Sequence, residues 1–351
     1  MTADRFQAIT SKYSSLRMAV VGDFCLDRYL EIDPSKQEIS IETGLPVHNV
    51  VNLRSQPGGA GTILNNLVAL GVWDISPVGL CGDDGEGYEL RRALGAKRGV
   101  RLNHFLRAPG RRTFTYCKPL VLAPGKAPVE LNRLDSKNWS PTPALIQGRL
   151  IDSVARLASE MDAIILLDQV DVPETGVITA RLLEAIGCIL NELPELLIVA
   201  DSRRGLRGFP KVTFKMNSTE LAFLADEKPP MELEKAKRIA IELARRQKQN
   251  VFVTLAEQGM LGASPYGGCE HVPAHPVHGE IDIVGAGDAV TANLTTALAA
   301  GATSREALEI ANAAASIVIH QLGTTGAATV GEIETILGRR PISSPDGESC
   351  L

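Results

Sequence analysis

The sequence of 351 residues predicts an α/β protein whose body is a mostly parallel sheet with helices on both faces, with a small antiparallel sheet attached. Three observations support this fold class. Short aliphatic runs alternate with longer segments of helical spacing, two strand-like regions interrupt the alternation, and the chain after Val277 is mostly helical. Alternation of this kind is typical of three layers, helix on sheet on helix.

The expected core strands are short, rich in Val, Ile and Leu, and several end in an acidic or small polar residue, as buried parallel strands do at their carboxyl ends. Ligands of such sheets bind beyond those ends. The strands are "MAVVGDF", "AIILLD", "ELLIVAD" and "NVFVTLA", and helices are expected at 143–161, 174–191 and 231–247.

The two irregular regions, about 28–57 and 111–134, are strand-like and rich in proline, and together they predict the small antiparallel sheet. Three helices are expected afterwards, at 287–300, 303–322 and 329–337. The last two begin with capping boxes, Thr303 with Glu306 and Thr329 with Glu332. We expect a single domain over 1–338 and a loose tail over 339–351.

Composition narrows the function classes. The net charge is -5 with no basic stripe, which argues against nucleic acid and anionic membranes and favours a small-molecule partner. The six cysteines include no C-x-x-C pair, so neither a zinc site nor a disulfide framework is indicated. No apolar run approaches the roughly 18 residues of a membrane span, and the first residues lack a signal-peptide core. We therefore expect a cytoplasmic protein.

The stretch "EIDIVGAGDAVTANL" carries the chemistry that the residues suggest. Gly285, Ala286 and Gly287 precede a helix, whose first amides lack internal partners and attract anions. They would form an anion hole for a phosphoryl group. Asp288 at the same mouth would take the proton from an attacking hydroxyl as general base. A plain helix start, with Asp288 favouring the helix dipole, stays an equal alternative on these residues alone.

Two other phosphate-binding schemes fit poorly. A dinucleotide G-x-G-x-x-G would need a third glycine where Val290 stands, and "HGEIDIV" is a poor core strand. A P-loop is also absent, because Leu120 and Ala127 stand where that motif requires Gly and Ser or Thr around Lys126.

Three motifs follow one another along the chain: a glycine pair at Gly58 and Gly59, N-x-x-E at Asn217 and Glu220, and D-x-x-G-A-G-D at Asp282 and Gly285 to Asp288. In this order and spacing they resemble the PfkB/ribokinase family of carbohydrate kinases, from Ala19 to Val330. Within that family the likeness is greatest to the kinase domain that phosphorylates D-glycero-D-manno-heptose 7-phosphate. The heptose-kinase stretches are "VVGDFCLDRYL", "ISIETGLPVHNV", "PGGAGTILNNLVALG", "LNRLD" and "HQLGTTGAATV".

The resemblance implies a ribokinase-like body with a β lid over the sugar, and it assigns acceptor residues. Asp23 and Asp27 would accept hydrogen bonds from sugar hydroxyls, and the Gly58–Gly59 backbone would approach the sugar. Asn66 follows on the next helix. Arg133 would pair with a sugar phosphate. For each there is a plainer alternative: a solvated strand end, a turn, a solvent-facing side chain or a surface salt bridge.

The resemblance also implies ATP and Mg²⁺. Asn217 and Glu220 would order Mg²⁺ through its water shell, since this ion keeps most of its waters. Taken alone, N-S-T-E is a helix capping box. Nucleotide contacts are expected at Thr254, Leu255, Gly259 and Asn312.

The sequence departs from the family pattern at four places: Ile283 and Thr62 replace a usual Thr and Asn, and "DQVDV" and "DSRRG" replace two heptose-kinase segments, so an expected lysine is missing or replaced by arginine. The prediction is an ATP-dependent kinase of a sugar or sugar phosphate, and a homodimer joined through the lid. A nucleoside or vitamin kinase, or a sugar-sensing protein that lost turnover, are the alternatives.

Overall fold

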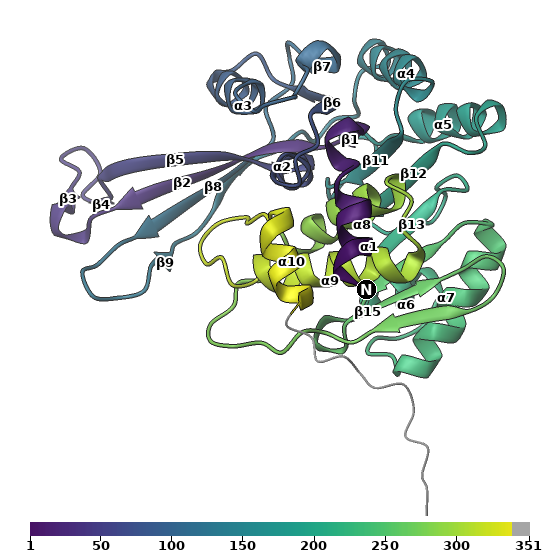
Figure 1. The fold of residues 1–351 in the computed structure, drawn as a ribbon. Helices are drawn as coiled ribbons and strands as arrows, with labels where there is room; N and C mark the ends of the chain where they lie inside the picture. The colour runs from purple at the N-terminus through teal and green to yellow at the C-terminus, as the bar shows by residue number, and fades with distance from the viewer. Residues whose placement is uncertain (339–351) are drawn as a thin grey trace, which may run out of the picture.

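The computed structural model describes residues 1–338, and the predicted tail at 339–351 lies outside them. A nine-stranded sheet forms the centre of the molecule (Figure 1). Its pairs are parallel except at one edge, where β14, β15 and β16 are antiparallel. The strand order is β16 (Cys269–Val272), β15 (Met260–Ala263), β14 (Val251–Thr254), β13 (Thr213–Asn217), β12 (Leu197–Ser202), β11 (Ala163–Asp168), β1 (Arg17–Gly22), β6 (Asp74–Cys81) and β7 (Phe105–Arg107).

Helices cover both faces of this sheet, because apolar side chains point to both faces of its strands and both faces must be buried. Met18 and Val20 of β1 join one hydrophobic core, whereas Ala19 and Val21 join the other, because successive side chains point to opposite faces. The first core is completed by α1 (Ala3–Thr10), α2 (Ala60–Ala69), α3 (Gly85–Gly95), α8 (Ala286–Ala299), α9 (Ser304–Val318) and α10 (Val330–Gly338). The second is completed by α4 (Ala144–Ala158), α5 (Ala180–Glu192), α6 (Ser218–Leu224) and α7 (Leu233–Gln247). The predicted three-layer body is confirmed.

One predicted helix start is wrong. The helix expected from Glu174 begins at Ala180, because Thr179 caps it by accepting from the Leu182 amide at 3.3 Å. Glu174 adopts a left-handed backbone conformation (φ 66°), and its carboxylate accepts from the Ala180 amide at 2.9 Å. The helix expected to run to residue 322 ends at Val318, while its capping box at Thr303 and Glu306 is present.

A second sheet, called here the lid sheet, projects from the body (Figure 1). It lies in the predicted regions but starts earlier, at Phe24, and its central pair, β2 with β8, is parallel. Its other pairs are antiparallel. The strands are β10 (Leu134–Ser136), β8 (Thr115–Val121), β2 (Phe24–Ile32) and β5 (Val50–Gly59), with β9 (Val129–Glu130) beside β8 and the pair β3 (Glu38–Ile39) and β4 (Pro46–Val47) apart.

The register gives the lid sheet two unlike faces. Asp27 lies opposite Gln56 and Tyr116, and Tyr29 lies opposite Lys118, so these polar side chains share the inner face. Leu30 lies opposite Leu53, and Leu134 lies opposite Cys117 on the other face. On that outer face Leu53 and Leu134 are 42% and 65% exposed.

Candidate active site

The first turn of α8 presents free backbone amides beside a carboxylate. Gly285 is the N-cap residue with φ 84°, and the helix begins at Ala286. Among the hydrogen bonds of residues 1–338, the amides of Gly287 and Asp288 donate to no acceptor, whereas Ala286 donates to the Ile283 carbonyl at 3.2 Å. The predicted anion hole therefore has free N–H groups in the first helical turn, and Ala286 is already engaged.

Asp288 has the acid–base properties of a general base. The pKa of this carboxyl is raised to about 7, first by burial and then by the negative charge of Asp201, while Lys215 and Arg203 act in the opposite direction. A carboxylate with a pKa near neutrality is ionised in a large fraction of molecules and accepts a proton readily.

A buried ion pair that the sequence analysis missed lies beneath this turn. Lys215 Nζ of β13 donates to Asp201 Oδ2 of β12 at 2.7 Å, and the Thr291 hydroxyl of α8 donates to the same oxygen at 2.9 Å. A Cβ added to Gly287 would lie 3.2 Å from Lys215 Nζ. The pair thus ties two strands to α8 and brings a cation under the anion hole. Its sequence signal is a lysine inside the apolar strand "TFKMN".

The predicted acceptor residues Asp27, Gly58 and Gly59 lie on two neighbouring strands of the lid sheet, β2 and β5. Asp27 forms an ion pair with Lys118 at 3.3 Å, and Lys118 also donates to the Tyr29 hydroxyl at 3.4 Å. The carboxylate of Asp27 lies against Gly58, where an added Cβ would overlap Asp27 Oδ2. Gly59 adopts φ 58° and caps α2. The charge of Asp27 also raises the pKa of Asp288, so the structure brings the lid and α8 together.

Asp23 is held differently from Asp27. Its buried carboxylate accepts from the backbone amides of Gln169, Val170 and Val177 at 2.9, 3.3 and 2.7 Å. The burial of Asp23 raises its pKa to about 6, with a further contribution from Asp168. Three amides already satisfy most of its acceptor capacity. Asp23 thereby joins the end of β1 to the loop that follows β11.

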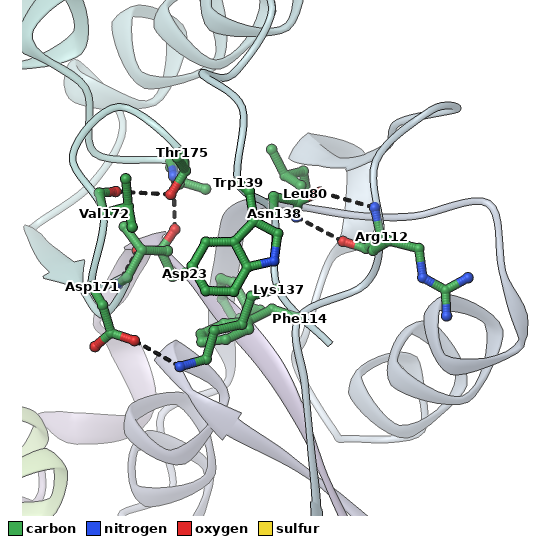
Figure 2. Close-up of a pocket in the computed structure, with 14 residues that line it drawn as sticks. Asp23, Leu80, Arg112, Phe114, Lys137, Asn138, Trp139, Asp171, Val172 and Thr175 are labelled. Atoms are coloured by element: carbon green, nitrogen blue, oxygen red, sulfur yellow. Dashed lines mark hydrogen bonds and ion pairs between the residues drawn. The ribbon is translucent and has the colours of Figure 1, made fainter. Parts of the chain in front are cut away.

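A cavity borders Asp23 but is too small for a sugar (Figure 2). Its accessible volume is about 30 Å³, room for about one or two water molecules. Figure 2 shows the indole of Trp139 in front of it, and Lys137 reaching Asp171, an ion pair of 2.7 Å. We therefore do not place the acceptor there.

Asn66 and Arg133 are the remaining predicted acceptor residues, and the structure adds a further arginine, Arg203. The side chain of Asn66 is fully buried, so it does not face solvent, and its amide donates to the carbonyls of Thr62 and Gly326 at 3.0 and 3.3 Å. Arg133 forms the salt bridge of its plainer alternative, with Asp135 at 2.6 Å. Arg203, which the sequence analysis did not single out, is exposed and donates to the Tyr116 hydroxyl at 3.3 Å.

Most of the predicted nucleotide-binding residues lie at or just after the carboxyl ends of two neighbouring strands, β13 and β14. Asn217 of β13 pairs with Thr254 of β14. The Leu255 amide donates to the Gly259 carbonyl at 2.8 Å and closes the turn into β15. Asn312 lies on α9, where its amide donates to the Pro273 carbonyl at 2.8 Å. Asn217, Thr254 and Leu255 therefore lie close together at the ends of β13 and β14, and Asn312 holds the loop after β16.

Asn217 and Glu220 form the capping box of α6. Asn217 Oδ1 accepts from the Glu220 amide at 2.9 Å, and Glu220 Oε2 accepts from the Asn217 amide at 2.7 Å. Burial raises the pKa of Glu220, with the charge of Asp201 adding to it. Within residues 1–338 no three His, Cys, Asp or Glu side chains are grouped to hold a metal directly. The amide oxygen of Asn217 and the carboxylate of Glu220 are oxygen donors, the kind that Mg²⁺ prefers.

The chain matches a known protein family over most of its length. Residues 17–329 match the model of the pfkB family carbohydrate kinases. The chain belongs to that family. It is a carbohydrate kinase, and kinases of this family use ATP and act on small molecules. The predicted family is confirmed.

Curated relatives match almost the whole chain. The bifunctional protein HldE of Rhodopseudomonas palustris is 31% identical over 93% of this chain, which covers 64% of the relative. HldE of a Bradyrhizobium strain is 30% identical over 91% of this chain and 63% of the relative. The chain thus spans less than two-thirds of the length of these two proteins.

Solved structures share the fold. Phosphofructokinase-2 of Escherichia coli in complex with potassium has a TM-score of 0.70 at 19% identity, covering 92% of this chain and 98% of that one. Ribokinase of Arabidopsis thaliana with ribose and ATP has a TM-score of 0.66 at 19% identity, with the same coverage. The ribokinase-like fold is therefore confirmed. Over residues 1–338, no helix has the length and apolar character to span a bilayer.

Proposed function

We propose that this kinase transfers the γ-phosphoryl group of ATP to a hydroxyl of a sugar or sugar phosphate, with Asp288 as general base. The observation that carries the proposal is the position of Asp288. A carboxyl with a pKa of about 7 lies in the same helical turn as the unpartnered amides of α8. The acceptor oxygen would lose its proton to Asp288 while it bonds to the γ-phosphorus, and ADP would leave. The free amides, with Gly285 to Gly287 around them, would stabilise charge on the transferring group.

The acceptor would lie between α8 and the inner face of the lid sheet. Asp27 would accept hydrogen bonds from its hydroxyls, and the backbone of Gly58 and Gly59 would contact it. Because Asp23 already binds three backbone amides, we assign it the positioning of that strand end. Asn66 would likewise support the site from behind.

A phosphate group on the acceptor could bind to two arginines, Arg203 and Arg133, which lie beside Tyr116. Arg203 forms no ion pair among the described residues, and its charge reaches both Asp171 and Asp288. Arg133 lies over the Tyr116 ring at 4.6 Å, the same tyrosine whose hydroxyl Arg203 contacts. Two guanidinium groups beside one tyrosine suit a doubly charged phosphate. This arrangement, together with the relatives named HldE, favours a sugar phosphate such as a heptose 7-phosphate.

The nucleotide would bind near the carboxyl ends of β13 and β14, where its predicted contacts lie. Thr254, Leu255, Gly259 and Asn312 would border it, and Asn217 with Glu220 would hold Mg²⁺ through water. When bound, the ion neutralises charge on the phosphates. Because the reaction consumes ATP, we place it in the cytoplasm.

A second copy of the chain would cover the outer face of the lid sheet. Its exposed apolar side chains make that face unlike an ordinary solvated surface, and β5 and β10 are open edges. A homodimer through the lid would cover both.

ADP release from Mg-ATP, measured with a panel of hexoses, heptose phosphates and nucleosides, tests the function. Loss of a positioned base in Asp288→Asn should lower kcat by about 10²–10⁴. The exposed Asp226→Asn is the matched control and should retain activity. An unchanged rate in Asp288→Asn would refute the mechanism. Binding of a sugar without ADP release would identify a sugar-sensing protein instead.

A further inference from the structure

The loop between α9 and α10 lies directly against the cap of α8. A Cβ added to Gly285 would lie 3.3 Å from Thr325 Cβ and 3.5 Å from Thr325 Cγ2. Since protein interiors are close-packed, a shift of this loop displaces its neighbour. The position of Thr325 therefore sets where the first turn of α8, and with it the anion hole, can lie.

Amide side chains brace this loop from three directions. From its base, Gln321 accepts from the Ala327 amide at 3.0 Å and donates to the Ala327 carbonyl at 3.1 Å. From α2, Asn66 donates to the Gly326 carbonyl at 3.3 Å. The third brace comes from the lid sheet, from Gln56 of β5. The loop is thus a common support of body and lid.

Gln56 binds the loop through both ends of its amide. Its Nε2 donates to the Thr325 hydroxyl at 2.8 Å, and its Oε1 accepts from the Thr324 hydroxyl at 3.1 Å. A donor and an acceptor bond on one planar group fix its orientation, so a displacement of the lid would break both.

The same glutamine also reaches the acceptor side of the site. Gln56 Nε2 lies 3.4 Å from the Tyr29 hydroxyl, which also accepts from Lys118. Lys118 in turn forms an ion pair with Asp27. A continuous path of polar contacts therefore runs from Thr325, through Gln56, to the carboxylate proposed to hold the acceptor, and at its other end Thr325 packs against the cap of α8 through carbon atoms.

We propose that Gln56 is a positioning residue that locks the lid sheet to the α9–α10 loop and so keeps the anion hole and the acceptor in register. The role rests on the proposed function, because it concerns the alignment of the two reacting groups. Misplacement of about 1 Å at a reacting centre costs up to about 10²-fold in rate. Gln56 itself touches neither reacting atom.

The test replaces Gln56 with an apolar side chain of similar size. Gln56→Met removes the hydrogen bonds to Thr324 and Thr325 and the longer one to Tyr29, while a side chain of similar size still fills the space. Its control, Asn52→Leu, lies on the same strand and face and loses one exposed hydrogen bond, to Glu31 at 2.9 Å. Gln56→Met should lower kcat by about 10–100-fold and leave the KM for ATP nearly unchanged, while Asn52→Leu should retain both constants. Equal kcat values in the two variants would overturn the proposal.

Hydrogen exchange supplies a readout that needs no turnover. The hydrogen-bonded amides within residues 283–289 and 321–327 should exchange faster in Gln56→Met than in Asn52→Leu, because one brace of the loop is gone. If the wild-type chain turns over no acceptor and this difference is still seen, the proposed function fails and the lock stands. If the wild-type chain is active and neither kcat nor exchange responds to Gln56→Met, the lock fails and the function stands. Thr324→Val combined with Gln56→Met should add no further loss in kcat; full additivity would count against the shared contact.

Discussion

The first turn of α8 and the lid sheet use charge in opposite ways. Beneath α8, Lys215 and Asp201 are paired in a buried position, with side chains 6% and 11% exposed. On the lid sheet, Arg54 and Glu31 form a pair of similar length, 2.6 Å, with Arg54 45% exposed. Water screens the second pair and not the first. The buried pair can therefore act on the pKa of a neighbour, whereas the lid pair can do little beyond its own contact.

The two regions also differ in what surrounds them. The α8 turn is tied to the central sheet, because its network of hydrogen bonds ends on β12 and β13. The lid sheet has a polar inner face and an apolar, open outer face. Under the proposed function, the chemistry would be set in the body, and the lid would supply recognition of the acceptor and the contact between two copies.

Removing Lys215 should have the largest effect on the free energy of unfolding. A small effect would contradict the contrast between the α8 turn and the lid sheet. Lys215→Met leaves the Asp201 carboxylate buried without its cation, which should cost about 3–5 kcal/mol of unfolding free energy. The positive charge of Lys215 lowers the pKa of Asp288, so its loss should raise that pKa above about 7. The acidic limb of kcat/KM, which requires ionised Asp288, should then move to higher pH. Chemical denaturation and pH–rate profiles measure both effects.

The conservative variant Lys215→Arg serves as the control for this pH shift. It keeps the positive charge beside Asp288, so the acidic limb should stay near its wild-type position even if packing is disturbed. A limb that moves equally in Lys215→Arg and Lys215→Met would mean that the charge of Lys215 does not set the pKa of Asp288.

Introducing a charge on the outer face of the lid sheet should have an intermediate effect, on assembly. Leu53→Glu places a carboxylate where we propose that a second copy packs, so the dimer should dissociate into monomers in analytical ultracentrifugation. Phe223→Glu, at a side chain 63% exposed on α6, is the matched control and should leave the mass unchanged. A wild-type chain that sediments as a monomer, or a Leu53→Glu dimer, would contradict the lid interface.

The exposed ion pair between Arg54 and Glu31 on the lid sheet should contribute least to the free energy of unfolding. Arg54→Ala removes the contact with Glu31 and the stacking on Tyr29 at 4.7 Å, and we expect a loss of at most about 1 kcal/mol of unfolding free energy. Raising the salt concentration should shrink this difference further. A loss as large as that of Lys215→Met would remove the distinction between the two regions.

Local sequence determined the elements of the fold. The strands of β1, β11, β12 and β14 were predictable because buried parallel strands leave short aliphatic runs. The capping box at Thr303 was predictable because its partners lie three residues apart. The start of α5 was not, since the helical spacing continues back to Glu174, whereas Thr179 caps the helix and it begins at Ala180.

Sequence also marked the candidate site wherever a motif is contiguous, and here Asp288 and its glycines are the clearest case. What only the tertiary structure decided is which distant residues meet there. Lys215, Asp201 and Thr291 come from three elements, and Gln56 meets Thr325 across 269 positions of sequence. Burial and hydrogen-bond geometry depend on packing between elements, and no local pattern records them. For the same reason Asp23 and Asp27, four residues apart and alike in sequence, have unlike surroundings: one is tied to backbone amides and the other faces Lys118.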